Sequence, residues 1–286
     1  MAHGPDGPLR RTGIALVLAV GTAVSGAAAA VPESPRLAAA VAHATAAPTA
    51  PVPVQGVGPG TVTETPGAGI CTAGFVFRGE GRTFLGHAAH CAGTGADTET
   101  DGCTSSTLRQ GVPVIVRGAG GPVTGVLRFS SWAAMQDRGE SDPDRCASND
   151  FALVELPPGT TVAPSLPVLG GPSGLRDTPP APGSVVHGLA VAERPVHRPG
   201  TLAREEGGGW LHTVRTTIPG APGESGGPLV DDGGAALGIL SGMEAGGDRR
   251  LEYTDLAMAV GYARTHGGPA DLELVPGTAP FAPPRP

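Results

Sequence analysis

The sequence predicts an all-β fold of two small β-domains followed by one short helix, and three observations lead to this prediction. From about residue 61 the chain consists of short apolar runs separated by turns rich in Gly and Pro, a pattern typical of β-sandwiches and barrels. A break rich in Pro and Gly, residues 157–183, divides these runs into two groups. The second group is followed by a single segment with helical periodicity.

The expected strands follow from the apolar runs in chain order. They are residues 74–77, 82–85, 112–117, 123–129, 151–156, 184–191, 211–217, 229–231, 236–241 and 252–254. The helix is expected over residues 255–265, where Asp255 can cap the first turn. Its apolar face consists of Leu256, Ala259, Val260 and Ala263.

Residues 1–30 have the features of a secretory signal peptide. Arg10 and Arg11 precede an apolar run, which is followed by small residues that end at Ala30. An uncleaved membrane anchor is the alternative, but a spanning helix needs about 20 strongly apolar residues, and Gly, Ser, Thr and Ala dominate the second half of this segment. We therefore expect a secreted protein in which residues 31–60 form a pro-segment or linker. The paired Arg also suits export in the folded state, so the export route is left open.

The composition excludes nucleic-acid binding, and the expected export bears on the state of the cysteines. The chain of 286 residues has a net charge of −7 and no basic tract, whereas nucleic-acid binding relies on clustered positive charge. No segment after residue 30 is apolar enough to span a bilayer, so no membrane association is expected after signal cleavage. The four cysteines of an exported protein are expected to form disulfides, for which three pairings exist. Residues 269–286, which are rich in Pro, are expected to be a disordered tail.

A candidate nucleophile, Ser225, lies in the hexapeptide Gly-Glu-Ser-Gly-Gly-Pro at residues 223–228. A nucleophilic serine needs a sharp turn that exposes its hydroxyl and lets nearby N–H groups bind an oxyanion, and flanking glycines permit such a turn. The alternative interpretation is an ordinary turn in a chain that contains 47 glycines.

A serine hydroxyl needs a base, and the base needs an acceptor that orients it. His90 follows a predicted strand and precedes Cys91; its alternative roles are a metal ligand or a surface histidine. Asp150 stands at the start of an apolar strand, where a carboxylate can be partly buried and hydrogen-bonded, although a strand cap is the alternative. The order His90, Asp150, Ser225 is that of the chymotrypsin arrangement and differs from the order in subtilisins and α/β-hydrolases.

Three segments carry a resemblance to a known family. They are Ala-Ala-His-Cys at residues 88–91, Asn-Asp-Phe-Ala-Leu at 149–153 and the hexapeptide at 223–228. These segments resemble those of the chymotrypsin-like serine proteases, especially secreted bacterial members such as the streptogrisins. The resemblance extends from about residue 71 to residue 265.

The resemblance implies two six-stranded antiparallel β-barrels with the active site in the cleft between them. The first barrel would comprise residues 61–170, and the second, with the C-terminal helix, residues 171–268. The reaction implied is peptide-bond hydrolysis through an acyl-enzyme, with Ser225 as nucleophile, His90 as general base and acid, and Asp150 as the partner of His90. The substrate would be a protein or peptide.

The resemblance also assigns roles to residues around this triad. The N–H groups of Gly223 and Ser225 would form the oxyanion hole, and Ser241 and Gly242 would bind the substrate backbone as an added strand. A disulfide between Cys71 and Cys91 is implied. That pairing leaves Cys103 to bond with Cys146.

Two positions depart from the family pattern. His87 stands where the family has Thr or Ser, and with Cys71, His90 and Cys91 it could form a zinc cluster. Because the cysteines of a secreted protein usually oxidise, we expect no metal there, and we expect no cofactor. Glu224 replaces the usual Asp, and no amino-terminal activation sequence follows the linker, so an internal Arg would have to pair with it.

The residues expected around the substrate side chain give a non-basic specificity. Pro219 stands where trypsin-like members carry an acid, and Leu251 would shorten the pocket, so a small or medium apolar side chain is expected.

Two alternatives stay open: a catalytically weak or silent relative that uses the cleft for binding, and a secreted esterase with the same triad. The acidic residues Asp97, Glu99 and Asp101 are expected to form a solvated loop, with a calcium site as the alternative. We expect a monomer.

Overall fold

The computed structural model describes residues 56–96, 98–191, 194–243 and 249–284. All of them belong to one compact unit, Ala50–Pro286. The expected signal segment, residues 1–30, and most of the expected linker, residues 31–60, lie outside the described residues.

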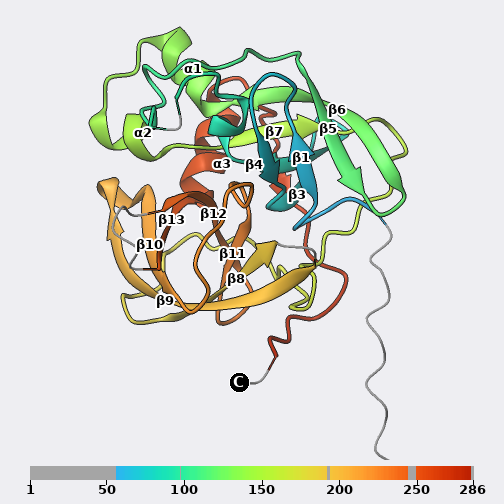
Figure 1. The fold of residues 1–286 in the computed structure, drawn as a ribbon, viewed down its shortest axis with the longest axis vertical. Coiled ribbons are helices and arrows are strands. Elements are labelled where there is room, and N and C mark those ends of the chain that lie inside the picture. The colour runs from blue at the N-terminus through green and yellow to red at the C-terminus, as the bar shows by residue number, and fades with distance from the viewer. Residues whose placement is uncertain (1–55, 97, 192–193, 244–248, 285–286) are drawn as a thin grey trace, which may run out of the picture. The chain divides into compact units, whose positions relative to one another are not determined.

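One part of this unit is an eight-stranded antiparallel sheet in the order β14-β3-β4-β7-β6-β5-β1-β2. Figure 1 labels six of these strands, β1 and β3 to β7, in its upper half. β2 lies at one end of the sheet, and β3 lies next to the other end, yet only two residues separate them along the chain. The sheet therefore has to curl until its ends approach each other. Its strands are β1 (Val62–Glu64), β2 (Ile70–Thr72), β3 (Phe75–Gly79), β4 (Arg82–His87), β5 (Pro113–Gly118), β6 (Gly121–Ser130), β7 (Ala152–Glu155) and β14 (Glu273–Leu274).

The second half is a closed six-stranded barrel in the order β10-β13-β12-β11-β8-β9. An apolar core that includes Leu202, Leu251 and Tyr253 fills it, and all three are buried. Its strands are β8 (Val185–Val191), β9 (Pro195–Glu206), β10 (Leu211–Thr216), β11 (Pro228–Asp231), β12 (Ala236–Met243) and β13 (Arg250–Asp255). The predicted all-β class is confirmed; the second barrel has the expected six strands, whereas the first sheet has eight.

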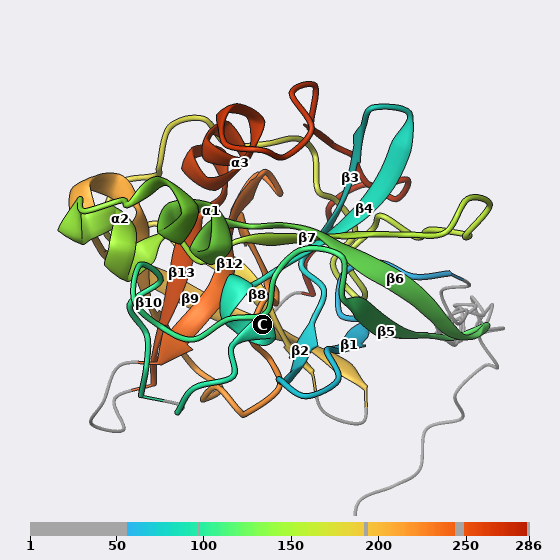
Figure 2. The ribbon, with the colours of Figure 1, turned by 90° about the horizontal axis from the view of Figure 1, so that it is seen from above.

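The expected C-terminal helix is present as α3 (Leu256–Thr265). The carboxylate of Asp255 accepts a hydrogen bond of 2.8 Å from the N–H of Met258, so this residue is the N-cap, as the sequence predicts. The four apolar residues of the predicted face are completely buried. α3 packs next to β12 and β13, close to α1 (Figure 2).

Besides the short strands β1, β2 and β14, three longer elements are absent from the sequence prediction. The 12-residue strand β9 contains Pro195, Pro199 and Gly200, which normally interrupt strands, but its partners β8 and β10 pair with it along its length. The helices α1 (Ser131–Arg138) and α2 (Pro143–Ser148) are too short to show a clear period. Their caps are regular, because Ser130 accepts from Ala133 N–H and Asp142 accepts from Arg145 N–H.

The prediction of a disordered tail is wrong for residues 269–284. β14 pairs with the edge strand β3, and Ala282 N–H donates to the carbonyl of Leu169. The ring of Phe281 lies against the ring of His187 on the second barrel, with centroids 5.4 Å apart. Backbone pairing, burial of Leu272 in the core and hydrogen bonds from the N–H groups of Thr278 and Ala279 to the Ser165 hydroxyl also hold this segment.

Candidate active site

The three residues of the predicted triad come from separate elements and line one cavity of about 590 Å³. His90 lies in the short 3₁₀ turn η1 (Ala89–Ala92) that follows β4, and Asp150 lies between α2 and β7. Ser225 lies in the loop between β10 and β11, and Gly223 of the same loop also lines the cavity. His90 and Asp150, 60 positions apart, meet because β4 pairs with β7 in the first sheet, and Ser225 reaches the same cavity from a loop of the second barrel.

His90 and Asp150 are joined by two hydrogen bonds. The Nδ1 atom of His90 lies 2.6 Å from Oδ2 of Asp150, and the N–H of His90 donates to Oδ1 at 2.8 Å. Asp150 is only 6% exposed, and its own N–H donates to the Thr254 hydroxyl, which in turn donates to the carbonyl of Ser148. The carboxylate is thereby held in one position and fixes the orientation of the imidazole ring.

The charge of Asp150 governs the protonation of His90. Burial lowers the pKa of His90, but the charge and hydrogen bond of Asp150 raise it more strongly, so that it lies above the ordinary 6.5. An imidazole with such a pKa accepts a proton more readily than a free histidine. No described residue forms a hydrogen bond with Nε2 of His90 or with the Ser225 hydroxyl. The structure thus has no direct hydrogen bond between these two groups.

The loop that carries Ser225 requires glycine on both sides. Gly223 and Gly226 have φ angles of 89° and 86°, a region that other residues rarely adopt. A Cβ atom on Gly226 would lie 2.4 Å from the carbonyl oxygen of Thr72. Among the described residues, none accepts a hydrogen bond from the N–H of Gly223 or of Ser225. These two donors remain available for an anion in the cavity.

Thr72 holds the same loop from the first sheet. Its N–H donates to the carbonyl of Ser225, and its hydroxyl donates to the carbonyl of Gly223, both at 2.8 Å. These two hydrogen bonds fix the orientation of two peptide carbonyls of the loop. On the other side, Gly226 N–H donates to Leu240 of β12.

Glu224 forms a buried ion pair with Arg198 of β9. Their side chains are 4% and 1% exposed, and a guanidinium nitrogen lies 2.5 Å from Oε2 of Glu224. The same carboxylate accepts hydrogen bonds from the N–H groups of Val191 and Ala221, and Arg198 donates to the carbonyl of Pro219. Glu224 therefore ties the segment that begins at Ala221 to β8 and β9. Arg198 is the internal Arg that the sequence required but did not identify.

The residues expected to bind substrate divide into two groups. Ser241 and Gly242 line the cavity, whereas Pro219 and Leu251 do not. Leu251 is 1% exposed and belongs to the core of the second barrel. A Cβ atom on Gly220 would lie 2.7 Å from Cδ2 of Leu251 and 2.8 Å from the sulfur of Met243. The space beside Gly220 is thus filled by these two side chains.

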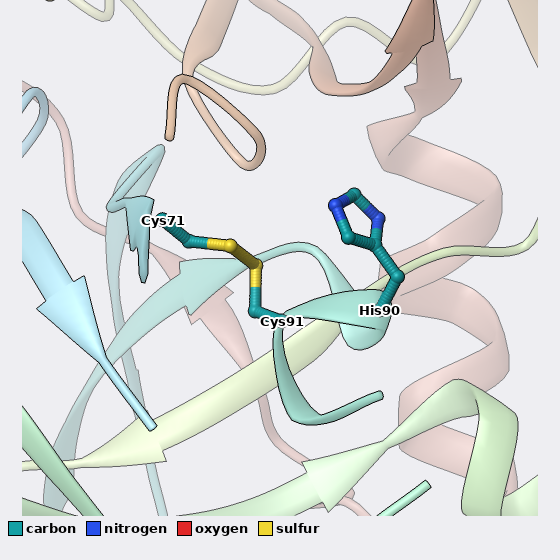
Figure 3. Close-up of side chains that lie close together, drawn as sticks. All are labelled: Cys71, His90 and Cys91. Atoms are coloured by element: carbon teal, nitrogen blue, oxygen red, sulfur yellow. A yellow bond between two sulfur atoms is a disulfide. The ribbon is translucent and has the colours of Figure 1, made fainter. Parts of the chain in front are cut away.

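The four cysteines form two disulfides. Cys71 is bonded to Cys91, and Cys103 to Cys146, which is the pairing that the family resemblance implies. Figure 3 shows the first bridge beside the ring of His90. The possible ligand atoms of Cys71, His90 and Cys91 lie within 4.8 Å of one another. The two sulfur atoms are bonded to each other, however, and offer no thiolate to a zinc ion. His87 does not belong to this group.

His87 ends β4 and is completely buried behind the loop of Ser225. Burial, reinforced by the nearby His90, lowers its pKa to about 4, although Asp150 acts in the opposite direction. Its Nδ1 lies 3.3 Å from the Thr63 hydroxyl, and Nε2 has no described hydrogen-bond partner. His87 is therefore neutral at neutral pH.

Two carboxylates of the acidic loop accept hydrogen bonds from nearby backbone N–H groups. Asp97 lies outside the described residues. The Asp101 carboxylate accepts from the N–H groups of Cys103 and Thr104, and Glu99 accepts from Ala96 and Ser106. Both carboxylates serve the local backbone.

Sequence reasoning missed three residues that shape the cavity. Glu252 and Trp132 line it, and Thr254 supports the Asp150 segment. Side chains alternate between the two faces of the predicted strand 252–254. This alternation could have indicated that Glu252 and Thr254 lie on the face opposite Tyr253. Nothing local marks Trp132, because its place depends on the unpredicted helix α1.

Comparisons with solved structures give several bacterial proteases. Protease A of Thermobifida fusca is 18% identical, with a TM-score of 0.47, over 79% of this chain and 100% of that one. A chymotrypsin of Cellulomonas bogoriensis is 18% identical, with a TM-score of 0.48, over 78% and 99%. A Nocardiopsis protease is 19% identical, with a TM-score of 0.44, over 78% and 99%.

No family model and no curated protein matches the chain. The likeness to these solved structures is a likeness of fold. The chain is similar in structure to bacterial serine proteases of the chymotrypsin type, the family that its three motifs resemble.

Proposed function

We propose that this protein is a serine endopeptidase that hydrolyses peptide bonds through an acyl-enzyme. The observation that carries the proposal is the pair of His90 and Asp150, 2.6 Å apart, in a cavity that also contains Ser225 and two unpaired N–H groups of the described loop. These are the parts that acyl transfer from an amide requires: a nucleophile, an oriented base and donors for an oxyanion.

The chemistry assigns one step to each group. The Ser225 oxygen attacks the peptide carbonyl carbon while His90 Nε2 takes the hydroxyl proton, and the resulting oxyanion binds the N–H groups of Gly223 and Ser225. Collapse of this intermediate breaks the C–N bond, and His90 returns the proton to the leaving amine. Water then attacks the acyl ester with His90 as base, which releases the acid and restores Ser225. Asp150 stabilises the imidazolium in both stages.

The filled space beside Gly220 supports a preference for a small or medium apolar residue before the scissile bond. A long side chain there would have to displace Leu251 or Met243. The edge of β12 supports binding of an extended substrate. β11 pairs with β12 only as far as Ile239, so the following residues Ser241 and Gly242 face the cavity without a strand neighbour on that side.

Secretion is part of the same proposal. The disulfides Cys71–Cys91 and Cys103–Cys146 suit an oxidising compartment, and residues 1–30 have the pattern of a signal peptide. In the described part of the chain, none of the helices has the length and apolar character needed to span a bilayer.

The test is labelling of purified protein with a fluorophosphonate, followed by peptide mass analysis. Modification at Ser225 and its loss in His90→Ala are expected. No labelling of the folded wild type would favour the catalytically silent relative. Matched ester and amide substrates of one acyl group separate the esterase: an endopeptidase cleaves both, whereas an esterase cleaves the ester alone.

A further inference from the structure

The walls of the cavity around Ser225 carry negative charge. Its lining includes the carboxylates of Glu99, Asp150 and Glu252, and no Arg among the described residues. Asp150 belongs to the triad, and Glu99 lies in the loop that follows η1. Among the described residues, Glu252 is the carboxylate that the second barrel contributes to the cavity.

The register of the second barrel determines where Glu252 lies. It occupies β13 between Leu251 and Tyr253, whose side chains fill the barrel core. Side chains alternate along a strand, so Glu252 has to leave the core on the opposite face. There it is directly opposite Gly242 of β12, and its Oε2 lies 3.0 Å from the position that a Cβ atom on Gly242 would take. The carboxylate therefore occupies the space over the glycine that is proposed to pair with substrate.

A peptide added to the open edge of β12 would bring alternate side chains onto this same face. In a peptide that pairs antiparallel with β12, the residues beside Gly242 precede the scissile bond, because the peptide runs from Gly242 toward Ser225. A Lys or Arg side chain is long enough to lie along Gly242 and reach the carboxylate. No side chain on Gly242 obstructs this path.

We propose that Glu252 is a specificity-determining residue that selects peptides with a basic side chain two to four residues before the scissile bond. This inference rests on the proposed peptidase function and extends it. The basic residue is distinct from the small apolar residue at the scissile bond, because Leu251 and Met243 close the space beside Gly220 and Glu252 lies on the opposite face of β13.

The test uses pairs of internally quenched peptides that are cleaved after Ala. Within each pair, Lys or norleucine occupies the second, third or fourth residue before the cleaved bond, so the two members differ in charge and little in shape. At low ionic strength the wild type is expected to show a kcat/KM about two- to fivefold higher for Lys at one of these positions, a range typical of a partly exposed ion pair. The ratio should approach one in Glu252→Gln and at roughly 1 M salt.

Glu273→Gln is the matched control. Glu273 is an exposed residue of β14 outside the cavity, and this variant removes the same charge from the chain. It should keep the wild-type ratio. Thermal unfolding of both variants checks that they are folded. In addition, Glu252→Arg should reverse the preference toward peptides with Glu over Gln at the same position. A ratio near one for the wild type at all three positions, or an unchanged ratio in Glu252→Gln, overturns the inference.

Binding separates this inference from the proposed chemistry. The Ser225→Ala variant cannot cleave, so its affinity for the same fluorescent peptides reports recognition alone. Tighter binding of Lys peptides that is lost in Ser225→Ala/Glu252→Gln supports the role of Glu252, even where the wild type shows no turnover and the peptidase proposal fails. Equal affinity for Lys and norleucine peptides refutes that role, even if the wild type is an active peptidase.

Discussion

Replacement of Arg198 by methionine removes the partner of a buried carboxylate, and we expect it to reduce both stability and reactivity. Glu224 is 3% exposed, so water cannot solvate its unpaired carboxylate unless the loop opens. Breaking a buried ion pair on one side costs about 3–5 kcal/mol. The hydrogen bonds from the N–H groups of Val191 and Ala221 remain and keep the loss from the upper end of this range.

The assay is urea unfolding with the disulfides intact, compared at pH 7. Arg198→Met should lower the free energy of unfolding by about 3 kcal/mol, whereas the double variant Arg198→Met/Glu224→Gln should recover part of that loss because the unpaired charge is gone. Arg176→Met is the control. It removes the partner of the buried Asp231, but Arg176 is 40% exposed, so water can reach the pair more easily.

Reactivity gives a second measurement of the same change. Glu224 immediately precedes Ser225, so a loosened loop should displace the N–H groups of Gly223 and Ser225 from the oxyanion position. We expect fluorophosphonate labelling of folded Arg198→Met to slow by about tenfold or more, while Arg176→Met labels at the wild-type rate. A loss of less than about 1 kcal/mol together with unchanged labelling would refute the role assigned to the Arg198–Glu224 pair.

Three further changes test other parts of the site. Asp150→Asn should reduce kcat by about ten-thousand-fold and lower the pKa seen in the pH profile of kcat/KM, which in the wild type lies above 6.5 because of Asp150; a loss of only a few-fold would assign the role to another acid. The folded-state pKa of His87, about 4, is below its unfolded value, so the stability it contributes is present above pH 6.5 and decreases as pH falls toward 4. Urea unfolding at pH 7 and at pH 4.5 measures how much free energy of unfolding is lost on acidification. This loss should be smaller in His87→Thr than in the wild type by up to about 3 kcal/mol, and equal losses in both would contradict this assignment. Joint replacement of Cys71 and Cys91 by Ser opens a closure of 20 residues and should cost about 3 kcal/mol in urea unfolding, whereas an unchanged midpoint would show that the bridge adds no stability.

Local patterns in the sequence account for most of the strands. The predicted runs match strands because short apolar segments between Gly and Pro turns can bury one face only in a sheet. β9 escaped because Pro199 and Gly200 lie within it, and only its neighbours β8 and β10 reveal that it is a strand. The helices α1 and α2 are stabilised by capping hydrogen bonds and packing rather than by a long apolar period. The tail forms β14 because β3 offers an unpaired edge.

The candidate site shows the same division. The residue types at His90, Asp150 and Ser225 are recognisable because acyl transfer needs those groups next to glycine and apolar strands, and this chemistry is local to each motif. The distance between His90 and Asp150 depends on backbone segments 60 residues apart, so it exists only in the packed chain.

From its residues alone, this protein is determined to be an all-β chain with a capped C-terminal helix and three motifs that suit a serine nucleophile. Tertiary structure decides that Leu251 turns into the barrel core while Glu252 enters the cavity, that Arg198 is the partner of Glu224, and that the tail is ordered. The physical reason is that periodicity and turn chemistry act over a few residues, whereas burial and charge pairing depend on which distant strands become neighbours.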